Sequence, residues 1–364
     1  MKKIKPYILI LIFVAFNLFA LDKPQSNNSK PSIKIGIILP LTGPLADVAT
    51  MFQDAAKFAL EEAPKNSIFN YELKFEDDAL QSAKAGTAAQ YLIDSEKVDA
   101  LISTWSYGGS VVAPIADRNK IIHFATAWDP TIAKGDMNFL HLDPPEEFIA
   151  KFIVEFKKRR IKTVSAIGIE ESGSIYALNE LKKQLTGSGI ELVSSDSVPM
   201  TENDFRALST KIRRLNPSII FLNLPGGQTN SFITQAKSLQ IKNPVTGITS
   251  FDVLDNLMLA EGVWYVSDSW LGHEFNEKFQ TKYNHNRTYG AGNYYDIVSL
   301  LIHKYEELGQ RLNGAKPEAK DVAAAIYDLE SFNSVFGKLS INKDGVISYG
   351  SSLVEITGGV RVQK

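Results

Sequence analysis

Short apolar runs that alternate with helical patterns dominate the sequence from residue 33 onward. The run at 33–40 (IKIGIILP) is bounded by turn residues, and the segment 46–62 that follows places apolar side chains at helical spacing. Continuous apolar runs of this length are typical of parallel strands that are covered on both faces. Because parallel strands are joined by crossover connections, usually helices, the alternation predicts an α/β fold with right-handed crossovers.

The alternation continues through two similar units. In the first unit, strands are expected at 71–77, 98–103 and 120–126, with helices at 82–96 and 109–118. After LDPPEE (142–147), strands are expected at 162–169, 190–198, 218–224, 244–249 and 262–268, with helices at 147–159, 174–187, 204–214 and 228–239. The segment 272–330 is mostly helical in pattern, and 335–350 is typical of a hairpin that turns at Asp344-Gly345. Two such units predict two doubly wound parallel-sheet lobes, and the tail is expected to cross back and complete both.

The first 20 residues differ from the rest of the chain. Lys2, Lys3 and Lys5 precede the apolar segment 7–19. A basic start and a short apolar core are typical of a secretory signal peptide, and the segment is shorter than the roughly 20 residues that span a bilayer. Leu18 stands where a small residue is preferred for cleavage, so cleavage and retention as an anchor both stay open. We expect export to the periplasm, with residues 21–32 as a flexible leader.

Composition excludes several classes of protein. The 364-residue chain has no cysteine, which excludes disulfides, thiol catalysis and thiolate metal sites. Loss of residues 1–20 would remove three lysines and no acid, so the formal net charge would change from −2 to −5, which argues against nucleic-acid binding. The five histidines lack metal-ligand spacing, Asp77 and Asp78 are interpreted as solvated turn acids, and no nucleophile or phosphate-loop motif is present. We therefore expect no catalytic residues, no cofactor and no metal.

Aromatic and polar residues follow two neighbouring strands, where ligands bind in open parallel sheets. In the first loop, TWSYGG (104–109), Trp105 and Tyr107 would wall an apolar ligand, Ser106 would add a hydroxyl, and the glycines would allow close backbone approach. The alternative is that the aromatics fill the core and the glycines only make the turn. The second loop, ATAWDP (125–130), places Trp128 and Asp129 beside the first. Two adjacent loops of this kind predict a shared cleft.

The segment IKIGIILPLTGPLADVA, which begins at Ile33, resembles the N-terminus of type I periplasmic solute-binding proteins of the leucine/isoleucine/valine-binding kind. Further similar pieces follow in order along the chain: FEDDALQSAKA, VDALIS, VAPIAD, NDFRALSTKIR, NYYDIVSLL and FGKLSINKDG. The resemblance implies two lobes joined by three crossover segments, with 33–144 and 272–336 as lobe 1 and 145–271 and 337–364 as lobe 2.

The resemblance also implies a function. A monomer would capture a small solute, such as an amino acid, an amide or a related metabolite, by hinge closure. It would then deliver the solute to the inner-membrane permease subunits of an ABC importer. The alternative is a ligand sensor of the same fold that reports to a membrane receptor.

Ligand contacts are implied residue by residue. By match, Ser106 offers its hydroxyl to a ligand carboxylate, with Trp105 beside it, and Ala127 offers its carbonyl. Several positions depart from the family pattern: Asp129 replaces a threonine, Ser172 replaces a tyrosine, and Pro225 and Gly226 replace an aromatic. The acid that holds a ligand ammonium in the family aligns near Thr249 or Ser250. The full expected set is Trp105, Ser106, Tyr107, Ala127, Trp128, Asp129, Ser172, Pro225, Gly226 and Thr249.

Asp129 is the departure with the most direct chemical consequence. A carboxylate beside a ligand carboxylate is repelled in a low-dielectric cleft, so Asp129 is a candidate partner for an amine, amide or hydroxyl. The hypothesis is a small polar or aromatic solute in preference to a branched-chain amino acid. The competing interpretation is that Asp129 caps the following turn at Pro130.

Overall fold

The computed structural model describes residues 30–364, apart from 253, 255, 269–272 and 286–288. The expected signal peptide (1–20) and most of the leader (21–32) therefore lie outside the described residues. Within the described part of the chain, no helix has both the length and the apolar character that crossing a bilayer requires.

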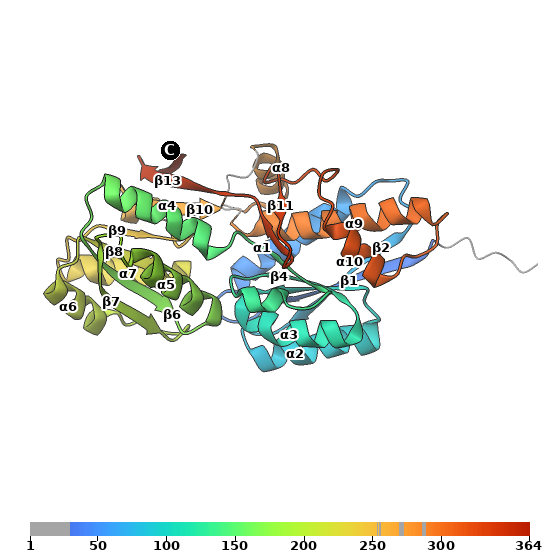
Figure 1. Cartoon of the computed structure of the whole chain (residues 1–364), viewed down its shortest axis with the longest axis horizontal. Coiled ribbons are helices and arrows are strands. Elements are labelled where there is room, and N and C mark those ends of the chain that lie inside the picture. Colours follow the sequence, from blue (N-terminus) through green and yellow to red (C-terminus); the bar gives the residue numbers. More distant parts are fainter. Residues whose placement is uncertain (1–29, 253, 255, 269–272, 286–288) are drawn as a thin grey trace, which may run out of the picture. The chain divides into compact units, whose positions relative to one another are not determined.

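A seven-stranded sheet is built mainly from the N-terminal half of the chain, in the order β11-β12-β5-β4-β3-β1-β2 (Figure 1). Its strands are β1 (Ser32–Leu39), β2 (Asn70–Asp77), β3 (Ala100–Thr104), β4 (Ile122–Thr126), β5 (Asn138–His141), β11 (Ser340–Ile341) and β12 (Val346–Ser348). Neighbouring strands pair in parallel, except in the β11–β12 hairpin. The hairpin predicted around Asp344-Gly345 is confirmed.

Helices cover both faces of this sheet, which explains its continuous apolar strands. On one face lie α1 (Ala46–Glu61), α9 (Ala291–Arg311) and α10 (Ala319–Ile326), with α8 (His273–Tyr283) in the same core. On the other face lie α2 (Ser82–Tyr91), the π-helical turn η1 (Leu92–Glu96) and α3 (Trp105–Asn119). All five residues of β3 and of β4 are buried, including the polar residues Ser103, Thr104, His123 and Thr126.

The second sheet has two parts. The parallel part runs in the order β7-β6-β8-β9, with strands β7 (Glu191–Val198), β6 (Thr163–Ile169), β8 (Ile219–Asn223) and β9 (Val245–Gly247). The antiparallel part contains β10 (Trp264–Asp268), β13 (Ser351–Thr357) and β14 (Val360–Gln363), and a bridge between Ile248 and Val266 connects the parts. The 3-10 helix η3 (Leu257–Ala260) precedes β10.

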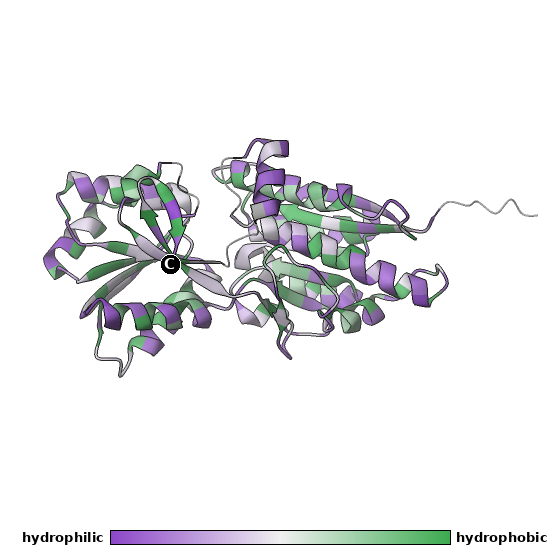
Figure 2. Ribbon diagram, turned by 90° about the horizontal axis from the view of Figure 1, so that it is seen from above, coloured by the Kyte–Doolittle hydropathy of each residue, from purple (hydrophilic) through white to green (hydrophobic). Residues whose placement is uncertain are grey.

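Helices cover this sheet on both faces as well. One face packs against α4 (Pro145–Lys158) and α5 (Ser172–Leu185), and the other against α6 (Arg206–Leu215) and α7 (Gly226–Ser238). Figure 2 shows hydrophobic and hydrophilic residues side by side along the covering helices, as expected where one helix face packs on a sheet. The predicted α/β fold with two doubly wound sheets is confirmed.

The chain passes between the two sheets and their helices three times: at 142–144, between β10 and α8, and at 349–350. The boundary predicted at residue 337 lies later in the structure. Val346 and Ile347 of β12 pair with Leu140 and His141 of β5, which adds two buried apolar side chains to the first sheet. Only β13 and β14 join the second sheet.

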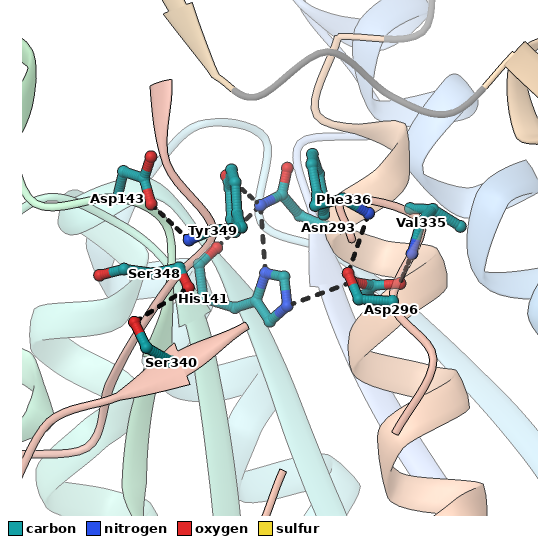
Figure 3. A network of polar contacts seen from close by, with 10 residues as sticks. His141, Asp143, Asn293, Asp296, Val335, Phe336, Ser340, Ser348 and Tyr349 are labelled. Carbon is teal, nitrogen blue, oxygen red and sulfur yellow. Dashed lines mark hydrogen bonds and ion pairs between the residues drawn. The ribbon is translucent and has the colours of Figure 1, made fainter. Parts of the chain in front are cut away.

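Polar side chains connect the first and third crossover segments (Figure 3). Asp143 is fully buried, and its Oδ1 accepts hydrogen bonds from the N–H groups of Tyr349 at 2.7 Å and Gly350 at 3.0 Å. Asn293 of α9 donates from Nδ2 to the Tyr349 hydroxyl at 2.8 Å and to the carbonyl of His141 at 2.9 Å. These contacts fix the two segments to each other and to α9. We call His141, Asp143, Asn293, Asp296 and Tyr349 the crossover network.

His141 and Asp296 form the titratable part of the crossover network. His141 Nε2 lies 3.7 Å from Asp296 Oδ2, and both side chains are fully buried. Burial lowers the pKa of His141 to about 4 and raises the pKa of Asp296 to about 7. Between these pH values both groups are neutral, so the contact is a neutral one despite its ion-pair distance.

Candidate functional site

The junction between β3 and α3 contains no loop. The helix begins at Trp105, directly after Thr104, and Trp105 makes the turn with a φ of +50°, which is unusual for a bulky residue. The segment 104–109, expected as a ligand-binding loop, is therefore a strand end followed by a helical first turn. A Cβ on Gly109 would come within 2.9 Å of Ile132 Cδ1. The glycine thus permits close packing against the 3-10 helix η2 (Pro130–Ala133) and not the expected approach of a ligand.

A cavity of about 120 Å³ lies where the strand ends of the two sheets meet. At about 30 Å³ per water, this volume holds roughly four water molecules, which is the scale of a small solute. The expected residues that line the cavity are Trp105, Ser106, Ala127 and Trp128 from the first sheet side, and Pro225, Gly226 and Thr249 from the second.

The remaining lining residues were not expected from the sequence. They are Leu45, Val48, Thr126, Leu142, Ile169, Glu171, Gly173, Ser174, Met200, Asn223, Leu224, Ile248, Ser250 and Tyr289. Glu171 is the most consequential of these, because it is charged and stands two residues after the end of β6. The position of a residue after a strand end was the available signal. Matching to the family pattern pointed instead to Ser172, which is exposed.

Three expected residues do not line the cavity. Tyr107 donates its hydroxyl to both carboxylate oxygens of Asp78, at 2.8 and 2.9 Å. Asp78, expected as a solvated turn acid, is fully buried beneath it. Asp129 Oδ1 accepts from the N–H of Thr131 at 2.9 Å and from its hydroxyl at 2.6 Å, and so caps η2. The capping interpretation of Asp129 is therefore the one observed, and Ser172 is the exposed first residue of α5.

Ser106 and Gly173 bring the two sides of the cavity into contact. The Ser106 hydroxyl accepts a hydrogen bond from the Asp129 N–H at 3.3 Å. A Cβ on Gly173 would overlap the Ser106 hydroxyl and would lie 3.3 Å from Trp128 Cβ. Glycine at 173 is therefore what allows the first turn of α5 to approach the first turn of α3.

Glu171 lies between these two helix starts. Its Oε2 caps α5 by accepting from the Ser174 N–H at 3.1 Å. Its Oε1 is enclosed and makes no hydrogen bond of normal geometry. Burial raises the pKa of Glu171, and the nearby N–H groups of Ser174 and Gly173, the Ser106 hydroxyl and the Tyr107 N–H act in the opposite direction.

The walls of the cavity are held by groups behind them. Tyr294 of α9 is fully buried, and its hydroxyl lies 2.6 Å from Thr104 Oγ1 and 3.3 Å from Thr126 Oγ1, at the ends of β3 and β4. On the opposite side, Thr249 has a φ of +49°. Two lining residues, Trp105 and Thr249, thus adopt left-handed backbone conformations that cost energy for such side chains and are often found at functional sites.

A wider surface groove of about 1510 Å³ adjoins the cavity and shares Ala127 and Trp128 with it. Its other lining residues include exposed lysines on separate elements, such as Lys134 and Lys343. Small ligands are usually bound in enclosed and largely apolar sites with a few polar groups. The smaller cavity has a mostly apolar lining with one charged side chain, whereas several lysines and acids line the groove. The described residues also contain no group of three or more acidic or histidine side chains placed to hold a metal ion.

The model of a family described as periplasmic binding protein matches residues 32–360 of the chain. Among curated proteins, the chain is 27% identical over 200 residues to a Leu/Ile/Val-binding protein of Rhizobium johnstonii, covering 52% of this chain and 53% of the relative. The chain thus spans about half the length of the curated relatives it matches.

Solved structures share the fold over nearly the whole chain. A leucine-binding protein from Thermotoga maritima superposes with a TM-score of 0.81 at 21% identity, covering 91% of this chain and 97% of that one. A solute-binding protein of an ABC transporter from Rhodopseudomonas palustris, in complex with 3,4-dihydroxybenzoic acid, gives a TM-score of 0.80 at 20% identity, covering 92% and 96%. The named ligands of these two proteins differ in chemistry, so this fold does not by itself determine the ligand.

Proposed function

Because the chain belongs to the periplasmic binding protein family, we propose that it captures a small solute in the cavity between its two sheets and delivers it to the permease subunits of an ABC importer. The observation that carries the proposal is the lining of the cavity by carboxyl ends of strands from both sheets. Ligands of open α/β sheets bind at that position. Neither sheet alone supplies the complete lining.

Hinge closure is the proposed mechanism. The first lobe would comprise 32–141 and 273–348, and the second 145–268 and 351–364, with the crossover segments as the hinge. A solute stabilises the closed arrangement only by the difference between its affinities for the closed and open forms. The contact of Gly173 with Ser106 supports hinge closure, because the two residues come from opposite sides of the cavity and lie close together.

The family and the similar structures are solute-binding proteins and not enzymes. The family indicates a periplasmic or extracellular location. We propose the periplasm, with residues 1–20 as the export signal, and a monomer as the working form. The solute would be a small polar or aromatic molecule whose apolar body fits between Trp105 and Trp128.

A compound screen on the chain without residues 1–20 tests the proposal. Thermal unfolding would be measured with amino acids, amides, amines and aromatic acids, because a ligand at 100 times its Kd adds about 2.7 kcal/mol of stability. A ligand should also reduce the radius of gyration in small-angle scattering.

Two variants locate the binding site of any ligand found. Trp105→Ala removes a wall of the cavity and should weaken binding by about tenfold or more. Tyr107→Phe is the matched control, since the Tyr107 hydroxyl is directed to Asp78, and it should bind normally. A screen in which no compound changes either observable, or equal losses in both variants, would contradict the proposed site.

A further inference from the structure

Glu171 is the only side chain with a formal charge among the described residues that line the cavity. No lysine, arginine or histidine is present in that described lining. The rest of the wall is apolar or carries hydroxyl, amide and indole N–H groups, among them the enclosed Trp128 Nε1, which makes no hydrogen bond of normal geometry. A ligand in this cavity therefore meets one carboxylate and no compensating basic side chain from the described lining.

The carboxylate of Glu171 has no basic partner in the described lining, and its two oxygens differ in their hydrogen bonds. Oε2 is used to cap α5, whereas Oε1 is enclosed without a hydrogen bond of normal geometry. Removing a carboxylate oxygen from water without a partner is costly, so a partner that arrives with the ligand would be strongly favoured.

The same carboxylate faces the groups that would otherwise bind an anion. The Ser106 hydroxyl and the Tyr107 N–H, in the first turn of α3, lie near enough to Glu171 to act against the rise in its pKa. A ligand carboxylate placed there would compete with Glu171 for these donors and would be repelled by its charge. The donors at the start of α3 therefore already face a carboxylate, that of Glu171, which comes from the second sheet side.

Building on the proposed function, we propose that Glu171 selects the ligand, which is a small molecule with an apolar body, a protonated amine and no carboxylate. The ammonium group pairs with the carboxylate of Glu171. The apolar body lies against the indole rings of Trp105 and Trp128, whose faces also attract a nearby cation. Glu171 is in this sense a specificity-determining residue.

Two matched sets of compounds test this inference by calorimetry on the chain without residues 1–20. One set is 3-methylbutylamine, 3-methylbutanol, 4-methylpentanoate and leucine, and the other is benzylamine, benzyl alcohol and phenylacetate. The bodies are alike within each set, so differences in affinity report on the polar group. We expect each amine to bind at least about tenfold more tightly than its acid, with the alcohol between them.

Glu171→Gln keeps the size of the side chain and removes its charge. It should weaken amine binding by about tenfold or more, leave alcohol binding within about threefold, and strengthen acid binding. Glu170→Gln is the matched control, because Glu170 is exposed, immediately precedes Glu171 and does not line the cavity. It should bind every compound as the unaltered chain does, and thermal unfolding of both variants checks that they fold.

Three results would overturn the inference: tighter binding of an acid than of its amine, tighter binding of leucine than of 3-methylbutylamine, or an amine-to-acid ratio unchanged by Glu171→Gln. If the amines fail while another compound from the wider screen binds and compacts the protein, only this inference fails. If no compound binds or compacts it, the proposed function fails as well.

Discussion

The strand ends of the two sheets present different chemistry to the cavity. After β4 in the first sheet, Asp129 turns its carboxylate back onto Thr131, and the rings of Trp105 and Trp128 form the wall. After β6 in the second sheet, Glu171 lines the cavity, caps α5 with one oxygen, and has its other oxygen enclosed without a hydrogen bond of normal geometry. One side provides an aromatic wall and the other provides a charge.

The difference follows from the length of the acidic side chain. Asp129 is short and bonds the N–H two residues on, so its acceptor is used locally. Glu171 has one more methylene and reaches the N–H three residues on with one oxygen, while its second oxygen makes no hydrogen bond of normal geometry. An acid that follows a strand can therefore be structural in one sheet and available to a ligand in the other.

The largest expected effect tests whether ligand binding at the two strand-end regions is independent of the crossover network. In the unaltered chain, the lowered pKa of His141 and the raised pKa of Asp296 act in opposite directions between pH 4 and 6.5, because the folded state holds a proton on Asp296 and the unfolded state holds one on His141. Their contributions to the pH dependence of stability cancel there.

Single variants should reveal the two opposing dependences of stability on pH. In Asp296→Asn, His141 alone remains, and stability should fall by up to about 3 kcal/mol as the pH drops from 6.5 to 4. In His141→Gln, Asp296 alone remains, and stability should fall by up to about 4 kcal/mol as the pH rises from 4 to 7. Urea unfolding at several pH values measures both slopes, and parallel slopes would refute the assignment. Ligand affinity should stay within about threefold, because neither residue lines the cavity.

The next largest effect concerns the approach of the two sides. Gly173→Ala would place a methyl group against the Ser106 hydroxyl and Trp128. Overpacking typically costs about 1–3 kcal/mol, so affinity should fall by about 5- to 100-fold. Gly227→Ala is the control, since a Cβ there has open space, and its affinity should not change. Titration with the ligand found in the screen compares the affinities of the two variants. Equal affinities would mean that ligand binding does not require the close approach of Gly173 to Ser106.

The smallest effect distinguishes the two acids directly. Asp129→Ala removes the cap of η2 and should destabilise the protein by about 1 kcal/mol. Ligand affinity should stay within about twofold, because the side chain does not line the cavity. Denaturation and titration of the same variant measure both quantities. A large loss of affinity would restore Asp129 as a ligand contact and remove the contrast with Glu171.

Most of the fold was predictable because its strands are buried on both faces. The apolar runs within β1, β3 and β4 directly indicate that these strands are buried. The position of β12 was not predictable in the same way. It has three residues, and its membership of the first sheet depends on pairing with β5, some 200 residues earlier, which no local pattern encodes.

The candidate site was partly predictable from the position of residues after strands. That rule identified Trp105, Ser106 and Trp128, which line the cavity. It could not show that Tyr107 is directed to Asp78, because the burial of Asp78 results from packing between α2 and α3 and not from local sequence. Nor does a sequence pattern indicate the left-handed conformation at Trp105, which starts α3 without a loop.

The strands β12 and β13 are separated by only two residues and belong to different sheets. During synthesis, the first sheet lacks β12 and the second lacks the partner of β10 until residues 346–357 have left the ribosome. Both sheets therefore stay incomplete until the same C-terminal segment has been synthesised. Folding in this protein is expected to finish in both halves almost together, and a chain cut before residue 346 would leave two damaged bodies instead of one intact half.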